Sequence, residues 1–411
     1  MQVQDVSPMM PEIDFADDPV EDLEDRLKIL SGNGKERIAP VRFGGRLAWI
    51  VFGYKDAVYG LGNDQDVPAK VEYITNWDTQ GAQPLKMQGD EHRRSRALLE
   101  APFKPAEVRR MADQLLVPTA DRLIDDFGDR RTVDLIADFT HRYSFLIISG
   151  ILGVPVKDEA ILRKLVYDML QGGQGNADQR RPAAIAAVKR MNEYLRPIVE
   201  DRRRDPRDDV ISYLVQAKVD GQPLDEETLF DYIRFLYPAG AETTHVAMGH
   251  LFQRVLSDPA LKQRLIAHPE DRPAVVDEVM RYTPPAMLQP RILERDTNIA
   301  GRDLPAGSKL LISIWNGNRD PEIFAEPDSF SLDHRRKPIL SFGIGPHFCI
   351  GTHLAKAEMA VSLGRLLERL PGLRLAKPAP PLIGTQVRWL TELVAEFDDI
   401  LPAKKADQKG N

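Results

Sequence analysis

The sequence predicts a mainly α-helical protein with small β-sheets, an α+β fold arranged around one long central helix. Three observations support this prediction. Helical patterns dominate residues 90–282, short β-rich stretches lie near the two ends of the chain, and residues 225–256 form one long and largely apolar helical segment. No stretch has the composition of an interdomain linker, so we expect residues 31–400 to form a single domain.

The elements follow in chain order. Residues 1–30 are acidic and contain several prolines, which predicts a loosely held arm. The stretch IAPVRFGGRLAWIVFGY has β-forming residues on both sides of Gly44-Gly45 and predicts a β-hairpin. Short strands are expected over 291–314 and a helix over 351–370. Pro-rich loop and strand should follow over 371–395, and a polar disordered tail over 401–411.

Composition limits the classes of function. The chain has 411 residues, of which 43% are hydrophobic, and a net charge of -7, which predicts a large core and no nucleic-acid binding. No run approaches the ~20 apolar residues of a membrane helix, and the acidic N-terminus is unlike a targeting peptide. One cysteine excludes a disulfide framework. We therefore expect a cytoplasmic protein without a membrane anchor.

The single cysteine, Cys349, lies in the loop SFGIGPHFCIGTHLAKAE. Gly343 and Gly345 allow the backbone to approach a large flat group, and the helix that follows favours a thiolate at its N-terminus. A buried inert thiol, a nucleophile with His347 as its base and a metal thiolate are the alternatives. His347 is poorly placed as a base. One thiolate cannot build a structural zinc site, but it can supply the axial ligand of a haem iron.

The segment FGIGPHFCIG, Phe342 to Gly351, resembles the haem-binding loop of the cytochrome P-450 family, F-G-x-G-x-H-x-C-x-G, and matches every fixed position. The resemblance implies haem b as the cofactor, with Cys349 as the axial iron ligand and Phe342, His347 and Gly351 as haem-binding residues. It also implies a fold in which the long central helix lies over the haem, with the cysteine loop and the following helix on the other side.

A second motif lies inside the long helix, for which Asp225 is the expected N-cap. The sequence AGAET, residues 239–243, resembles the family's A/G-G-x-D/E-T motif. This resemblance makes Glu242 and Thr243 the catalytic acid–alcohol pair and assigns Ala239 and Gly240 to haem binding. Pro238 is expected to bend the helix at this point. A helix irregularity without a catalytic role is the alternative.

The segment EVMR, Glu278 to Arg281, resembles the family's E-x-x-R pair. Asp271 is expected to cap this helix. The resemblance implies a structural pair behind the haem loop, and His334 stands where the family usually has the arginine that completes the network. A solvated surface ion pair worth ~0–1 kcal/mol is the alternative.

The two haem propionates need basic partners. The segment GDEHRRSR resembles the family's H-x-x-x-R segment, which implies His92 and Arg96 as ligands. Arg291 stands where the family often has a further propionate-binding arginine, and His347 lies beside the cysteine. Arginine suits carboxylates because its guanidinium donates two parallel hydrogen bonds. Ordinary surface charge is the alternative for each residue.

The resemblance implies a monooxygenase that inserts one oxygen atom of dioxygen into a hydrophobic small organic molecule by hydroxylation, epoxidation or O-dealkylation. We expect a monomer that receives electrons from a separate ferredoxin and its reductase. Candidate docking residues for this acidic carrier are Arg93, Arg94, Arg109 and Arg110. A peroxide-driven haem-thiolate peroxygenase and a non-catalytic haem sensor or carrier are the alternatives. The substrate pocket is expected to use residues 70–86, 171–182, 284–289 and 383–387.

Overall fold

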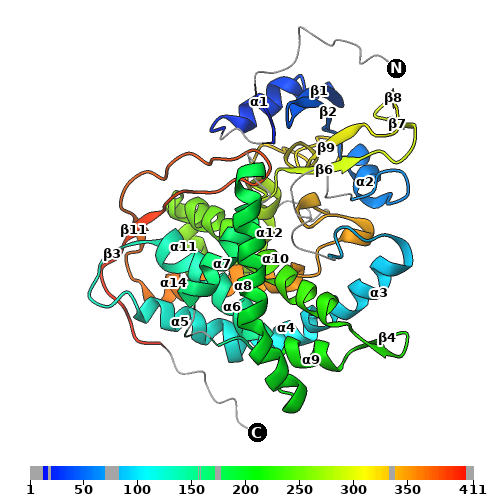
Figure 1. Cartoon of the computed structure of the whole chain (residues 1–411). Helices are drawn as coiled ribbons and strands as arrows, with labels where there is room; N and C mark the ends of the chain where they lie inside the picture. The colour runs from blue at the N-terminus through cyan, green and yellow to red at the C-terminus, as the bar shows by residue number, and fades with distance from the viewer. Residues whose placement is uncertain are drawn as a thin grey trace.

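The computed structural model describes residues 13–16, 20–69, 83–155, 157, 159–171, 177–332 and 338–403. Within these ranges the chain is mainly helical, with small sheets at the edges of a helical body (Figure 1). This arrangement confirms the predicted fold class. The helices are α1 (Leu23–Leu30), α2 (Tyr54–Gly62), α3 (Gly89–Glu100), α4 (Pro105–Met111), α5 (Val117–Asp125), α6 (His141–Leu152), α7 (Glu159–Gln171), α8 (Ala177–Arg204), α9 (Val210–Gln216), α10 (Glu226–Leu256), α11 (Pro259–Ala267), α12 (Arg272–Tyr282), α13 (Ile314–Gly317) and α14 (Thr352–Arg369).

Helix α10 is the predicted long central helix. It has 31 residues, and the carboxylate of its N-cap Asp225 accepts a hydrogen bond of 2.8 Å from the backbone N–H of Thr228. The helix continues through Pro238 without a break. It packs along α6 and also contacts α12 and α14, so much of its length from Leu229 onward is buried, whereas Glu226 and Glu227 at its start are exposed.

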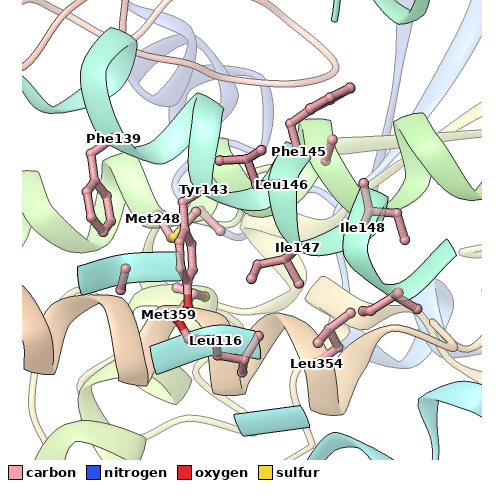
Figure 2. Close-up of a cluster of buried hydrophobic side chains, with 14 of the residues drawn as sticks. Leu116, Phe139, Tyr143, Phe145, Leu146, Ile147, Ile148, Met248, Leu354 and Met359 are labelled. Carbon is pink, nitrogen blue, oxygen red and sulfur yellow. Dashed lines mark hydrogen bonds between the residues drawn. The ribbon is translucent and has the colours of Figure 1, made fainter. Parts of the chain in front are cut away.

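The main core lies where α6 meets α10 and α14. Figure 2 shows side chains of α6 directed towards residues of these two helices, among them Met248 and Met359. Tyr143 is fully buried in this cluster, and its hydroxyl donates a hydrogen bond of 3.1 Å to the carbonyl oxygen of Leu116. The hydroxyl is thereby satisfied in an apolar setting, as a buried polar group requires.

The principal sheet has the strand order β1-β2-β9-β6. Strands β1 and β2 form the predicted hairpin, with Phe43 opposite Arg46 and both turn glycines at positive φ. Strand β9 pairs parallel to β2 and antiparallel to β6. The strands are β1 (Ile38–Phe43), β2 (Arg46–Val51), β3 (Thr132–Asp134), β4 (Lys218–Val219), β5 (Gln222–Pro223), β6 (Leu288–Ile292), β7 (Thr297–Ile299), β8 (Arg302–Leu304), β9 (Lys309–Ser313), β10 (Arg374–Leu375) and β11 (Val394–Glu396).

The described part of the N-terminal segment is firmly packed, so the prediction of a loosely held arm is wrong for these residues. Phe15 and Leu23 are fully buried in a cluster with strands β1 and β2. The hydroxyl of Thr385 donates to the carbonyl oxygen of Phe15 at 2.8 Å, and Arg388 donates to Glu24 at 2.7 Å. Apolar residues interspersed among the acidic ones provide this anchorage.

One stretch of the described helices, Leu135–Leu152, is long and apolar enough to pass a length-and-composition test for a membrane span. Of this stretch, 67% is buried inside the protein. It includes α6, which lines the core in Figure 2. Its apolar character therefore matches its place in the core.

Candidate active site

The cysteine loop is a tight structure held by its own backbone. The N–H of Cys349 donates a hydrogen bond of 2.8 Å to the carbonyl oxygen of Phe342. Gly343 and Gly345 have φ values of 72° and 76°, in the left-handed region that favours glycine. A Cβ on Gly345 would also lie 2.7 Å from the Cα of Gly62. The glycines of the motif thus allow the loop to turn and to approach α2 closely.

The sulfur faces the start of α14, as the sequence predicts, but its ionisation differs from the expectation. Burial raises the pKa of the Cys349 thiol, and the lowering effects of the Gly351 N–H, the Thr352 hydroxyl and the Arg96 charge are smaller. The helix start therefore acts in favour of the thiolate, as predicted, but burial outweighs it in the protein alone. Solvent still reaches Cys349, and a bound metal ion deprotonates a coordinating thiol outright.

Helix α3 braces the cysteine loop. Nη1 of Arg96 donates to the carbonyl oxygens of Pro346 and Phe348, at 3.0 and 2.6 Å. One residue earlier, the Ser95 hydroxyl lies 2.6 Å from the hydroxyl of Tyr232 on α10. Two adjacent residues of α3 therefore connect the cysteine loop to the central helix.

Two histidines pack against each other, with their rings tilted, next to the cysteine loop. His92, which is 3% exposed, lies with its ring centroid 4.2 Å from that of His347. Nε2 of His347 lies 3.2 Å from a carboxylate oxygen of Asp64. Burial lowers the pKa of His92, and the nearby His347 lowers it further. Burial alone would raise the pKa of Asp64, but the hydrogen bond from His347 contributes to a net lowering.

The middle of α10 is open to solvent on one side. Ala239 and Thr243, one helical turn apart, are exposed, although Pro238, Ala241 and Thr244 beside them are buried. The Thr243 hydroxyl donates a hydrogen bond of 3.2 Å to the carbonyl oxygen of Ala239. This solvent-exposed face, which we call the α10 notch, consists of Ala239 and Thr243.

Gly240 lies on a different face of α10, the face that packs against α6. A Cβ at this position would lie 3.0 Å from Cδ1 of Ile148, which is a tight contact with α6. Glycine therefore allows α10 and α6 to pack closely at the level of the notch.

Glu278 and Arg281 form a buried bidentate pair on α12, with N–O distances of 2.7 and 2.9 Å. They are 6% and 2% exposed, so the pair is not a solvated surface contact. Arg281 also donates to the carbonyl oxygens of Asn318, Pro327 and Ser329, at 3.1, 2.8 and 2.8 Å. The pair thereby fixes the segment that precedes the cysteine loop.

Asp271 does not cap α12 with its side chain, contrary to the prediction. Its carboxylate instead lies 2.6 Å from Nε of Arg264 on α11. His334 lies outside the described residues. An ion pair with the preceding helix thus replaces the expected cap.

Comparisons with known proteins agree with this geometry. A family model described as "Cytochrome P450" matches residues 273–379. The chain is 31% identical to Cytochrome P450 109 of Bacillus spizizenii, over 80% of this chain and 81% of that protein. It is also 31% identical to the mycinamicin IV hydroxylase/epoxidase of Micromonospora griseorubida, over 84% of this chain and 86% of that protein. The chain belongs to the cytochrome P450 family.

A solved cytochrome P450 structure, CYP109Q5 from Chondromyces apiculatus, is similar to this fold with a TM-score of 0.84 and 25% identity, covering 95% of this chain and 99% of that one. The protein is therefore a P450 monooxygenase, an enzyme that uses dioxygen to oxidise small molecules. The family implies a haem-thiolate cofactor.

The residues around Cys349 suit a P450 haem. The sulfur donor is accessible, and the basic groups His92, Arg96 and His347 surround its loop. Within the described residues, the guanidinium of Arg291 makes one hydrogen bond, of 2.8 Å to the neighbouring carbonyl oxygen of Pro290. Burial lowers the pKa of Arg291 to about 10. A buried cation without a bonded carboxylate is well suited to binding an acidic group of a cofactor.

Phe342 and Gly351 complete the predicted set. The Phe342 ring is buried, and the Lys356 ammonium lies 5.3 Å from its centre. Gly351 is the N-cap residue of α14. Among the catalytic candidates, Glu242 does not contact the loop: its carboxylate lies 3.6 and 3.9 Å from His245 and His141.

Sequence reasoning missed several residues of this region: Asp64, Ser95, Tyr232, His141 and His245. Asp64 and His347 are 283 residues apart in the chain, and Ser95 and Tyr232 are 137 apart. The local sequence around these residues does not indicate that they pair with one another. The spacing of Glu242 and His245 on one helix face is the one signal that was available.

Proposed function

We propose that this P450 uses haem b to insert one oxygen atom of dioxygen into a hydrophobic small organic molecule by hydroxylation, epoxidation or O-dealkylation. The observation that carries the proposal is the α10 notch. An exposed threonine in the middle of a buried helix, next to the acidic residue Glu242, gives a hydroxyl and a carboxyl for proton handling at a site that solvent reaches. A haem carrier without catalysis has no need of this pair.

The chain's own residues have separate roles in this proposal. The haem thiolate, when bound, activates dioxygen. Cys349 binds the iron, and Arg96, His347, His92 and Arg291 bind the propionates. The Thr243 hydroxyl holds a proton at the notch, and Glu242 supplies protons to it.

The substrate wall is proposed to include residues 284–289 and 383–387. These two segments lie side by side, because Met287 N–H donates to the carbonyl oxygen of Gln386 at 2.7 Å and Ala286 pairs with Val387. Their side chains are small, apolar or amide groups, which favours a hydrophobic substrate. The other predicted wall segments, 70–86 and 171–182, lie largely outside the described residues.

We also infer that residues 31–400 act as one haem domain, because the largest cluster of buried side chains extends from Met87 to Phe397. We propose a cytoplasmic monomer that receives electrons from a separate ferredoxin and its reductase. Arg93, Arg94 and Arg110 contact Asp90, Asp220 and Asp208 respectively. These contacts reduce the positive charge offered to an acidic carrier. Charge reversal at Arg109, which is exposed, is therefore the sharpest test of this docking surface.

The proposed function is tested first by the absorption spectrum of the reduced holoenzyme with carbon monoxide, beside a Cys349→Ser variant. A strongly red-shifted Soret band that is absent from the variant is the expected result. Turnover with a ferredoxin and its reductase then separates a monooxygenase from a haem carrier. A spectrum typical of histidine ligation, or product formation with peroxide alone, would contradict the proposal.

A further inference from the structure

A second polar cluster lies on another face of α10, where Glu242 meets two histidines. One carboxylate oxygen lies 3.9 Å from Nε2 of His141, the first residue of α6, and the other lies 3.6 Å from Nε2 of His245. The two imidazole rings are 4.9 Å apart. We call these three residues the His–Glu–His cluster. At these distances the groups form ion pairs rather than hydrogen bonds. A small movement of the side chains, or one bridging water, would connect them by hydrogen bonds.

The cluster holds Glu242 away from the α10 notch. Adjacent residues of a helix project in different directions, so Glu242 and Thr243 do not face each other. Glu242 shares its face with His245, three residues on, and is directed towards α6. A proton carried by Glu242 therefore reaches Thr243 only after the carboxyl group leaves this resting position or passes the proton through water.

Arg163 on α7 fixes the proton of His141. Its Nη2 lies 2.7 Å from Nδ1 of His141, and a guanidinium can only donate. Nδ1 of His141 is therefore the acceptor, and the ring proton lies on Nε2, next to Glu242. Arg163 is itself held by Glu159 at 3.3 Å, and Glu159 also binds Arg142 at 3.1 Å.

This arrangement argues against a metal ion in the cluster, although its nitrogen and oxygen atoms lie within 4.8 Å of one another. A metal would take the lone pair of Nε2 on His141 and move the ring proton to Nδ1. That proton would then face the donor group of Arg163. Nearby, Glu159 pairs with both Arg163 and Arg142, and Arg142 also pairs with Asp126.

His245 differs from His141, because nothing fixes its tautomer. Its Nδ1 is buried and has no hydrogen-bond partner among the described residues. Burial lowers the pKa of His245 below its usual range, and the nearby Glu242 offsets only part of this effect. His245 can therefore take up and release a proton, whereas the donor from Arg163 prevents protonation of His141 at Nδ1.

Glu242 is a poor store of protons by itself. Burial acts to raise its pKa, but the two histidines lower the pKa to about 2. At pH 7 the carboxyl group of Glu242 is therefore almost entirely ionised. An imidazole holds a proton far more often at this pH.

We propose that His245 transfers to Glu242 the proton that is used at the α10 notch. His141 is a positioning residue that holds the Glu242 carboxylate in place until this transfer occurs. One proton moves from Nε2 of imidazolium His245 to the carboxylate of Glu242, and both groups become neutral. The electrostatic attraction between them ends, so the carboxylic acid can rotate towards Thr243. Solvent returns a proton to His245, whose side chain is 13% exposed. The inference rests on the proposed function of Glu242.

The protonation states can be tested without turnover. We would record the imidazole ¹⁵N resonances of the reduced, carbon monoxide-bound holoenzyme, which is diamagnetic, and identify them with His141→Gln and His245→Gln. His141 should carry its ring proton on Nε2, and His245 should titrate. Arg163→Gln should remove this preference of His141 for Nε2. A proton on Nδ1 of His141 in the wild type would overturn the proposal.

Turnover gives the second test. His245→Gln keeps a polar side chain of similar length but cannot carry a proton. Product formation should fall by about tenfold or more, with a larger solvent isotope effect and loss of the decline in rate towards high pH that deprotonation of His245 causes. His268→Gln, at an exposed histidine on the end of α11, is the matched control and should match the wild type.

Two outcomes would overturn the proposal. One is a wild-type pH profile and isotope effect in His245→Gln. The other is stoichiometric Zn²⁺ binding to the holoenzyme, measured by calorimetry, that both His141→Gln and His245→Gln abolish, because the cluster would then be a metal site. Absence of turnover in the wild type, with the expected NMR result, would count against the proposed function alone.

Discussion

Arg96 donates a hydrogen bond of 2.6 Å to the carbonyl oxygen of Phe348, the residue immediately before Cys349. The same nitrogen also donates to the carbonyl oxygen of Pro346. Arg96 therefore positions the loop from which the proposed iron ligand projects, in addition to its proposed role towards a propionate.

Arg96→Gln should weaken haem retention. The variant loses charged hydrogen bonds worth about 1.5–3 kcal/mol each, so we expect roughly 10- to 100-fold faster transfer of haem to a scavenger apoprotein. Arg94→Gln is the matched control, because Arg94 lies on the same helix and contacts Asp220 at 3.7 Å. Equal rates of haem loss in the two variants would contradict this role of Arg96.

Gly345→Ala should damage the cysteine loop more than Gly343→Ala does. Both positions have positive φ, which costs an alanine about 1–2 kcal/mol. At Gly345 the new Cβ would also meet the backbone of Gly62 at 2.7 Å, whereas at Gly343 the nearest atom is 3.5 Å away. Haem content and thermal unfolding of the two purified variants would measure the difference. Similar losses would show that the contact with α2 is unimportant.

Glu278→Gln should destabilise the fold strongly. The change leaves the buried guanidinium of Arg281 without its countercharge, at a cost on the order of 3–5 kcal/mol. Urea unfolding of the holoenzyme would measure this loss. Lys164→Ala, which removes an exposed ion pair with Asp168, should cost about 0.5 kcal/mol or less. A Glu278→Gln variant as stable as this control would contradict the structural role.

Thr243→Ala should uncouple the enzyme. Loss of the hydroxyl at the α10 notch removes the proton-holding group there, so reducing equivalents should be consumed with less product and more peroxide. The measurement is the product formed and the peroxide released per NADH oxidised. Thr243→Ser retains a hydroxyl and should preserve most of the coupling. Equal coupling in the alanine variant and the wild type would remove the proposed role of Thr243.

Glu358→Gln should flatten the pH dependence of stability. Glu358 is 1% exposed, and burial raises its pKa well above the usual range. The folded state keeps a proton that the unfolded state loses above pH ~4.3. Stability should therefore fall as pH rises towards the folded pKa, by at most about 1.4 kcal/mol per pH unit.

The measurement for Glu358 is urea unfolding at pH 5.5 and 7.5. The glutamine variant should gain stability relative to the wild type at the higher pH, because glutamine has no proton to lose. Glu107→Gln, at a partly exposed position on α4 where the carboxylate pairs with Arg110, is the control and should follow the wild type. An unchanged pH slope in Glu358→Gln would mean that this carboxyl group does not titrate differently in the two states.

Local sequence determined much of what could be predicted. The hairpin at Gly44-Gly45, the N-cap Asp225 and the loop from Phe342 to Gly351 depend on residues close together in the chain. The motif also identified Cys349. The helix start lowers the pKa of its thiol as predicted, but burial, which the sequence does not show, outweighs this effect.

The features that the sequence did not predict depend on contacts between segments that are distant in the chain. Asp271 was expected to cap α12, but Arg264 on the preceding helix competes successfully for its carboxylate. The pairing of Asp64 with His347, and the contact of His141 with Glu242, depend on how helices pack rather than on any local pattern. The packed N-terminal segment was missed for the same reason, since its partners are Thr385 and Arg388.

That N-terminal contact has a consequence for biosynthesis. Phe15 and Thr385 are 370 residues apart, so the ribosome must add nearly the whole chain before the two can meet. At ~5–20 residues per second this takes on the order of 20 to 70 seconds. During that time the apolar side chains of the first segment have no native partner at the far end of the chain. The contacts between the N-terminal segment and the segment around Thr385 are therefore among the last to form. Until they form, the nascent chain should depend on chaperones.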